Sequence, residues 1–211
     1  MKSFEISPSI IASDYTLIRD TLESIKKNNI SWVHFDVMDG VFVPNITFGM
    51  GFIKDCRKVS DLFFDVHLMI ESPEKYIEQF ADAGSDLITF HLEATNDINE
   101  CIKLIKYKNK KVGISIKPAT KSDAIIPYLK DIDLILIMTV EPGFAGQKMI
   151  DDAIPKISET KNIICNSNVS NNILIQVDGG VCKDNYKKII ESGADVIVAG
   201  SAYFKGDFIN S

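Results

Sequence analysis

The chain has 211 residues, 45% of them hydrophobic, which is enough apolar material for one globular domain with a large core. Its net charge of −6 argues against a surface that binds nucleic acid or an anionic membrane. The N-terminus lacks a signal-peptide pattern, no run of about 18 apolar residues predicts a membrane span, and the four cysteines have no paired spacing. We therefore expect a cytoplasmic, soluble protein with free thiols and a single domain over residues 1–211.

Eight apolar runs of strand length recur along the chain, and helical patterns separate most of them. The runs cover residues 4–10, 32–37, 62–66, 87–90, 112–116, 134–138, 173–177 and 196–199. The first helical pattern covers residues 15–27, with Ser13 and Asp14 as candidate N-caps, and Pro73 begins a second one. Further helical patterns cover residues 98–107, 151–158 and 184–191.

Strands that alternate with helices are typical of a parallel sheet, either closed into a barrel or open and doubly wound. Eight strands are the number that a closed barrel needs, and no GxGxxG follows the first strand. The sequence therefore predicts an α/β fold, a single-domain (β/α)8 TIM barrel.

Polar side chains lie at the carboxyl end of almost every predicted strand, where such a barrel builds its active site. In chain order they are Ser7 and Ser9, His34 and Asp36, Asp65 and His67, His91 and Glu93, Lys117, Glu141, Asp178, and Gly200 with Ser201.

Four of these residues form a candidate metal site. His34 and Asp36 are two residues apart on one strand face, His67 sits in the similar motif FDVHLM, and Asp178 precedes Gly179 and Gly180 in QVDGG. Two imidazoles and two carboxylates suit a borderline divalent ion with open positions for substrate oxygens. Taken singly, each could be a hydrogen-bonded core residue or a turn cap. Together at one barrel mouth they would concentrate charge that a metal ion neutralises.

Two further groups remain open between a functional and a structural role. Met38, Met69 and Met138 lie near strand ends, where they could fill the core or line the pocket and exclude water from it. His91 and Glu93 could orient the metal ligands or form an ordinary pair in a loop.

The segment VEPGFAGQ, residues 140–147, is a candidate phosphate loop, and we expect Lys148 to begin the helix that follows it. Its glycines can free backbone N–H groups for an anion, as can the glycines that follow the next two strands. Only two arginines occur, Arg19 and Arg57, and neither lies in these motifs, so backbone amides are the expected phosphate ligands.

These motifs together resemble the ribulose-phosphate 3-epimerase family of the pentose phosphate pathway. The similarity begins with ISPSIIASD at Ile6, continues through HFDVMDGVFVPN, DVHLMIESPEKYI, FHLEAT, IKPAT, MTVEPGFAGQ and VDGG, and ends with AGSAYF at Phe204.

The resemblance implies a role for each matching residue. His34, Asp36, His67 and Asp178 would hold one divalent metal ion per subunit, namely Zn²⁺, Fe²⁺, Mn²⁺ or Co²⁺. Asp36 and Asp178 would also be the catalytic proton-transfer residues. Ser9 and His67 would contact the ketose phosphate substrate. The resemblance also implies that the subunits form a homo-oligomer. The phosphate would meet Gly143, Phe144, Ala145, Gly146, Gly179, Gly180, Gly200 and Ser201.

The implied reaction interconverts D-ribulose 5-phosphate and D-xylulose 5-phosphate. Inverting C3 beside a ketone removes a proton from one face and returns one to the other, so two carboxylates must flank that carbon. A metal ion can stabilise the enediolate that forms between the two steps.

Two departures from the family pattern bear on these expectations. Ala145 stands where the phosphate loop commonly has glycine, a variant similar to allulose-6-phosphate 3-epimerase, which acts on a six-carbon ketose phosphate. Only ten residues follow Ser201, so we expect a short last helix.

A different class of function is a metal-independent lyase of the orotidine-phosphate decarboxylase type. Such a lyase resembles proteins with a DxKxxD motif at a strand end, and this sequence has no such motif. A non-catalytic phosphate-binding barrel is the remaining alternative.

Overall fold

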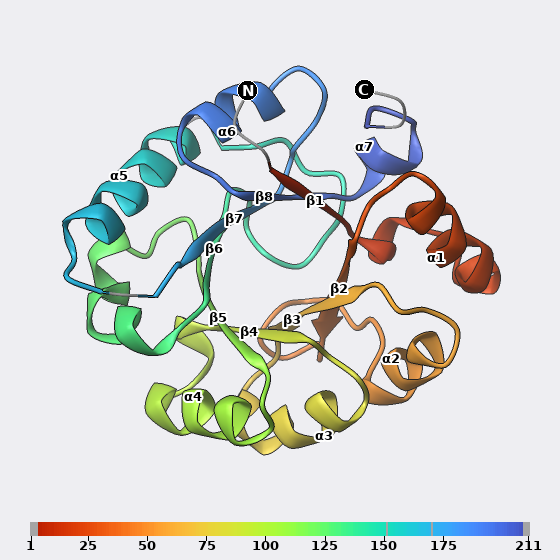
Figure 1. Cartoon of the computed structure of the whole chain (residues 1–211), viewed down its shortest axis with the longest axis horizontal. Coiled ribbons are helices and arrows are strands. Elements are labelled where there is room, and N and C mark those ends of the chain that lie inside the picture. Colours follow the sequence, from red (N-terminus) through yellow and green to blue (C-terminus); the bar gives the residue numbers. More distant parts are fainter. Residues whose placement is uncertain (1–3, 151, 170, 209–211) are drawn as a thin grey trace.

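Eight parallel strands form a barrel in the computed structural model, which describes residues 4–150, 152–169 and 171–208 (Figure 1). The strands pair in the order β1-β8-β7-β6-β5-β4-β3-β2, and a parallel bridge between Ser9 and His34 joins the first strand to the second. Helices surround the barrel in Figure 1. The predicted (β/α)8 barrel is therefore confirmed, and the open doubly wound alternative is wrong.

All eight predicted strand runs are strands. Their bounds are β1 Glu5–Pro8, β2 Trp32–Met38, β3 Phe63–Met69, β4 Leu87–His91, β5 Lys111–Ile116, β6 Leu134–Met138, β7 Leu174–Asp178 and β8 Val196–Ala199. The strands β3, β4 and β7 extend one to three residues beyond the predicted runs, so they include the polar residues His67, His91 and Asp178, and β2 extends by Met38.

The helical segments differ more from the prediction. The α-helices are α1 Ile18–Lys27, α2 Met50–Arg57, α3 Ile77–Asp82, α4 Ile98–Tyr107, α5 Ala153–Asn166, α6 Tyr186–Glu191 and α7 Ser201–Phe204. The Asp14 side chain accepts a hydrogen bond from Thr16 N, as expected of a cap. The expected first helix opens with a 3-10 turn, Tyr15–Leu17, and the Pro73 segment opens with another, Pro73–Lys75. The last helix is short, as predicted.

Three helical predictions need correction. Helix α2 and the 3-10 helix Ser122–Asp131 between β5 and β6 were not predicted. Gly49 and Gly51 weaken the helical pattern of the first, and Pro127 interrupts that of the second. No helix begins at Lys148, because α5 starts at Ala153; Asp151, the predicted start of the 151–158 pattern, lies outside the described residues.

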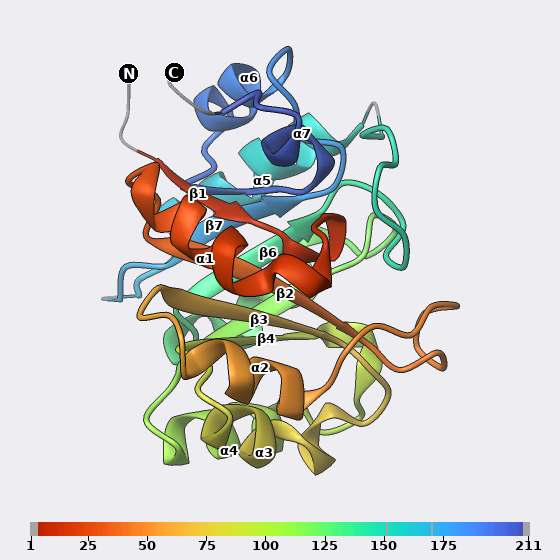
Figure 2. The same cartoon turned by 90° about the vertical axis from the view of Figure 1, so that its right-hand side faces the viewer.

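The barrel interior changes from apolar to polar along its axis. Leu87, Leu134 and Leu136 pack with Trp32 and Phe63 into an apolar cluster. Serines, histidines and aspartates that alternate with outward-facing apolar residues occupy the positions nearer the carboxyl ends. The loops that follow β2 and β6 extend from this same end of the barrel (Figure 2). Among the described helices, none combines the length and apolarity of a membrane span.

Candidate active site

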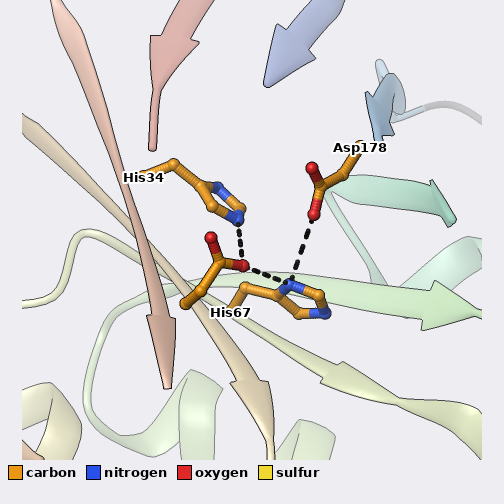
Figure 3. Close-up of side chains that lie close together, drawn as sticks. His34, His67 and Asp178 are labelled. Carbon is orange, nitrogen blue, oxygen red and sulfur yellow. Dashed lines mark hydrogen bonds and ion pairs between the residues drawn. The ribbon is translucent and has the colours of Figure 1, made fainter. Parts of the chain in front are cut away.

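The structure brings together the four predicted metal-binding residues at the carboxyl end of the barrel. One ligand atom from each of His34, Asp36, His67 and Asp178 lies within 4.8 Å of the others. Asp36 Oδ1 is 3.2 Å from His34 Nε2 and 3.3 Å from His67 Nδ1, and His67 Nδ1 is 3.9 Å from Asp178 Oδ2. Figure 3 shows both imidazole rings and the Asp178 carboxylate converging on one point.

Strand register explains why the motifs of β2 and β3 look alike. Asp36 is paired with His67 across the two strands, and His34 is paired with Asp65. Inward-facing residues at equal heights of neighbouring strands lie side by side, so each histidine lies beside an aspartate. The two motifs therefore supply one cluster rather than two separate sites.

Asp65, which the sequence placed at the active-site end of β3 without a specific role, contacts one of the four candidate ligands. Asp65 Oδ2 lies 2.7 Å from His34 Nδ1 and accepts hydrogen bonds from Ser7 Oγ at 3.0 Å and Gln176 Nε2 at 2.5 Å. All four side chains are fully buried. This network orients the His34 ring so that Nε2 faces the cluster, as in the carboxylate–histidine pairs of metal sites.

A second chain of contacts leads outward from His67. His67 Nε2 lies 2.9 Å from His91 Nε2, and His91 Nδ1 lies 3.3 Å from Glu93 Oε2. Burial lowers the pKa of His91 to about 4. Burial alone would raise the pKa of Glu93, but hydrogen bonds from His91, Thr120 and Lys117 N lower it to about 2. His91 is thus neutral and Glu93 ionised at neutral pH.

The two carboxylates of the cluster differ in protonation. Burial opposes ionisation of Asp36, but the charges and hydrogen bonds of His34 and His67 hold its pKa well below the usual range. Burial, followed by the charge of Asp36, raises the pKa of Asp178 to about 7. Ser9 Oγ donates to Asp36 Oδ2 at 2.5 Å. One carboxylate is therefore ionised while the other can hold a proton at neutral pH.

The charge of the site fits a divalent cation. Burial opposes protonation of His34, but Asp65 and Asp36 raise its pKa well above 6.5, whereas burial lowers the pKa of His67. In the described part of the chain, no lysine or arginine pairs with Asp36, Asp65 or Asp178. A cation among the four ligand atoms would supply the missing positive charge.

A cavity of about 220 Å³ lies against the cluster. Asp36 and Asp178 line it, whereas His34 and His67 have no exposed surface. The predicted contact of His67 with substrate therefore stays a prediction. The other predicted site residues that line the cavity are Ser9, Met38, Met69, Met138, Gly143, Phe144, Ala145, Gly146, Gly179, Gly180, Gly200 and Ser201.

The three methionines serve both predicted roles. Met38 and Met69 pack with Val43 in a small apolar cluster, and Met138 packs on the apolar barrel interior. All three also form cavity wall and are at most 5% exposed. They therefore place apolar surface beside the carboxylates and add no acid or base there.

The β6–α5 loop is held by two side chains that the sequence did not reveal. Asn45 Nδ2 donates to Gly143 O at 2.9 Å, and Gln147 Nε2 donates to Glu141 O at 2.7 Å and to Phe144 O at 3.0 Å. Asn45 lies in the loop after β2, 98 residues from Gly143, so no local pattern predicts the contact.

The glycines after β7 have a packing role that the sequence did not suggest. A Cβ atom at Gly180 would lie 2.2 Å from Met149 N, and one at Gly179 would lie 2.5 Å from the Val140 side chain. Both glycines also have positive φ angles, of +65° and +117°. They let the β6–α5 loop approach β7 while their backbone remains on the cavity wall.

The family model and the related sequences name the same family. The model of the ribulose-phosphate 3 epimerase family matches residues 5–204. The ribulose-phosphate 3-epimerase of Bacillus subtilis (strain 168) is 42% identical over 200 residues, covering 95% of this chain and 92% of the relative. That of Treponema pallidum (strain Nichols) is 41% identical over 205 residues, covering 97% and 93%. In fold alone, 3-hexulose-6-phosphate synthase from Salmonella typhimurium is similar, with a TM-score of 0.70 and 20% identity over 98% of this chain and 93% of that one.

Proposed function

The chain belongs to the ribulose-phosphate 3-epimerase family and is an isomerase, and on this premise we propose that it interconverts D-ribulose 5-phosphate and D-xylulose 5-phosphate. The observation that carries the proposal is the pair Asp36 and Asp178, which lines one cavity with the pKa of Asp36 lowered and that of Asp178 raised. We propose that the enzyme works in the cytoplasm, in the pentose phosphate pathway, as a homo-oligomer, as the family resemblance implies.

The two aspartates would act on opposite faces of C3. In one direction ionised Asp36 takes the proton from C3, and protonated Asp178 delivers a proton from the other side. The return reaction exchanges their roles. Base and acid coexist at one pH because the histidines lower the pKa of Asp36 while burial raises that of Asp178. Ser9 would keep Asp36 oriented through its hydrogen bond to Oδ2.

One divalent cation per subunit, Zn²⁺, Fe²⁺, Mn²⁺ or Co²⁺, is the cofactor that this site would hold. Its ligands would be His34 Nε2, His67 Nδ1 and one oxygen each of Asp36 and Asp178. When bound, such a cation supplies a Lewis acid that stabilises negative charge on the oxygens beside the reacting carbon.

The glycine-rich segments on the cavity wall would hold the phosphate. They are residues 143–146, Gly179 with Gly180, and Gly200 with Ser201. Their backbone N–H groups provide donors without a competing side chain. Lys205 also lines the cavity and offers the only lysine side chain among its lining residues. His67 would reach substrate only through the ligands around the cation.

A six-carbon ketose phosphate is the second candidate substrate. Ala145 lies on the cavity wall at the position where the family's phosphate loop commonly has glycine, and this variant is similar to allulose-6-phosphate 3-epimerase. The extra methyl group can shift the loop and so change the room for the phosphate end of the substrate. The remaining motifs favour the pentose.

Proton exchange at C3 tests the proposal. The protein is incubated in D₂O with D-ribulose 5-phosphate or D-allulose 6-phosphate, with and without a chelator, and followed by NMR. We expect chelator-sensitive deuterium incorporation together with epimer formation, faster for the pentose. Faster reaction of the hexose would reverse the choice of substrate. No exchange with either in folded, metal-loaded protein would leave a non-catalytic phosphate-binding barrel.

A further inference from the structure

His67 is joined at its outer nitrogen to two residues that the proposed reaction does not use. Its Nε2 atom lies 2.9 Å from His91 Nε2, and His91 Nδ1 lies 3.3 Å from Glu93 Oε2. The other oxygen of Glu93 accepts hydrogen bonds from Lys117 N, at 2.9 Å, and from the hydroxyl of Thr120. This chain connects the candidate cation site at the end of β3 to the loop after β5.

When Glu93 is ionised and both imidazoles are neutral, one arrangement of protons satisfies the contacts between His67, His91 and Glu93. A carboxylate only accepts, so the proton of a neutral His91 must be on Nδ1, where it is donated to Glu93. His91 Nε2 is then an acceptor, and the facing nitrogen of His67 must be the donor. A neutral His67 protonated on Nε2 has a lone pair on Nδ1, the atom that faces Asp36 and Asp178. In the cation-free site Asp36 Oδ1, 3.3 Å from Nδ1, competes for the same proton, and the His91–Glu93 chain favours Nε2.

The surroundings fix the geometry of this chain. His91 has no exposed surface, and its ring packs on that of Phe42 with centroids 4.9 Å apart. The Glu93 side chain is 24% exposed, and its Oε1 is held by two donors from the β5 loop, so Oε2 faces His91. Neither residue needs to move for the Nδ1 atom of His67 to receive a cation.

We propose that His91 and Glu93 are positioning residues, which hold His67 in the tautomer that presents an Nδ1 lone pair and so prepare the cation site before a cation binds. The inference rests on the proposed cation site. His91 and Glu93 would orient the His67 ring as Asp65 orients that of His34. The two histidine ligands would thus be oriented differently, His34 directly by a carboxylate and His67 through a second imidazole.

Two substitutions break the chain at different points. His91→Phe keeps an aromatic ring but removes the acceptor of the His67 proton. Glu93→Gln can turn its amide N–H₂ toward His91, which would move the His91 proton to Nε2 and the His67 proton to Nδ1, where it blocks the cation. Thr89→Val is the matched control, because Thr89 is buried on the same strand two residues before His91, and its hydroxyl has no hydrogen-bond partner among the described residues.

The primary measurement is the Co²⁺ dissociation constant of each purified variant, by competition with a chromophoric chelator. We expect His91→Phe and Glu93→Gln to raise it about 10- to 100-fold, the usual effect of removing a residue that orients a metal ligand, and Thr89→Val to leave it unchanged. Nitrogen-15 NMR of the cation-free wild-type protein should show His67 protonated on Nε2.

The proposal is overturned if both His91→Phe and Glu93→Gln, when folded, bind Co²⁺ as the wild type does, or if the NMR spectrum places the His67 proton on Nδ1. If His91→Phe does not fold, Glu93→Gln and the wild-type tautomer decide between the two outcomes. None of these measurements needs turnover, so a protein that binds Co²⁺ but epimerises neither ketose would refute the proposed function and leave this inference standing.

Discussion

Among single residues, Asp178 is the one whose substitution we expect to lower turnover most. It lines the cavity, and its raised pKa of about 7 lets it carry a proton at neutral pH. Asp178→Asn keeps the shape but can neither donate nor accept the C3 proton, so we expect kcat to fall roughly 10²- to 10⁴-fold. Steady-state kinetics with saturating metal measures this. Inhibition by inorganic phosphate should be unchanged, and an equal loss of phosphate affinity would contradict the assignment.

The same residue is expected to destabilise the cation-free protein at high pH. The pKa of Asp178 rises from 3.8 to about 7 on folding, so the folded chain keeps a proton that the unfolded chain releases in this window. The contribution of Asp178 to stability is therefore lost as the pH rises from about 4 through 7. Asp178→Asn removes this penalty, and we expect it to raise the free energy of unfolding at pH 8 by up to about 4 kcal/mol.

Urea denaturation of cation-free wild type and Asp178→Asn at pH 5 and pH 8 tests that expectation. The gain in stability should be larger at pH 8 than at pH 5. A gain in stability that is independent of pH would show that the substitution acts through packing. A loss of stability at pH 8 would show that ionised Asp178 does not destabilise the folded protein.

At the scale of elements, the loop after β2 supports the loop after β6. Asn45 donates to Gly143 O, and Val43, which packs with Met38 and Met69, lies beneath Gly143. Both loops extend from the same end of the barrel (Figure 2). The Gly143 segment therefore depends on a contact from outside its own loop to keep its place on the cavity wall.

Asn45→Ala should loosen this contact without disturbing the aspartates. A lost hydrogen bond of about 1 kcal/mol corresponds to a rise of about fivefold in KM for the ketose phosphate, with kcat changed less than twofold. Hydrogen exchange in residues 141–147 should become faster. The control is Ile46→Ala at the neighbouring position, where the side chain is 76% exposed. A fall in kcat with unchanged KM would instead connect Asn45 to the proton-transfer step.

At the scale of the whole molecule, the cation should stabilise the barrel as well as serve the reaction. Residues from β2, β3 and β7 would share one ion, so binding joins strands that are distant in sequence. A ligand present at 100 times its dissociation constant stabilises the folded state by about 2.7 kcal/mol. Because a cation binds the ionised carboxylate of Asp178 more tightly than the protonated one, its affinity and this stabilisation increase as the pH rises toward and above 7.

Chelation should therefore lower the melting temperature more at pH 8 than at pH 6. Differential scanning fluorimetry with and without a chelator measures the difference, and re-addition of Co²⁺ should restore the higher value. The variant Thr89→Val should respond as the wild type does. A chelator effect that is equal at both pH values would argue against proton displacement from Asp178.

The sequence alone determined the barrel and the inner part of its site. Side chains along a strand alternate between its two faces, and β2, β3 and β7 carry polar residues toward their carboxyl ends. The fold and the set His34, Asp36, His67 and Asp178 therefore follow from local patterns. The last helix was also predicted from the length of chain that follows Ser201.

Only the tertiary structure decided what surrounds that set. Asp65 meets Ser7 and Gln176 across 58 and 111 residues of chain, and Asn45 meets Gly143 across 98 residues. Such contacts depend on how the strands align around the closed barrel and on how the loops pack, which no local pattern encodes. The helix expected from Lys148 was wrong because residues 148–150 continue the β6–α5 loop, where Ile150 N donates to Thr139 O and Gln147 Nε2 donates to Glu141 O.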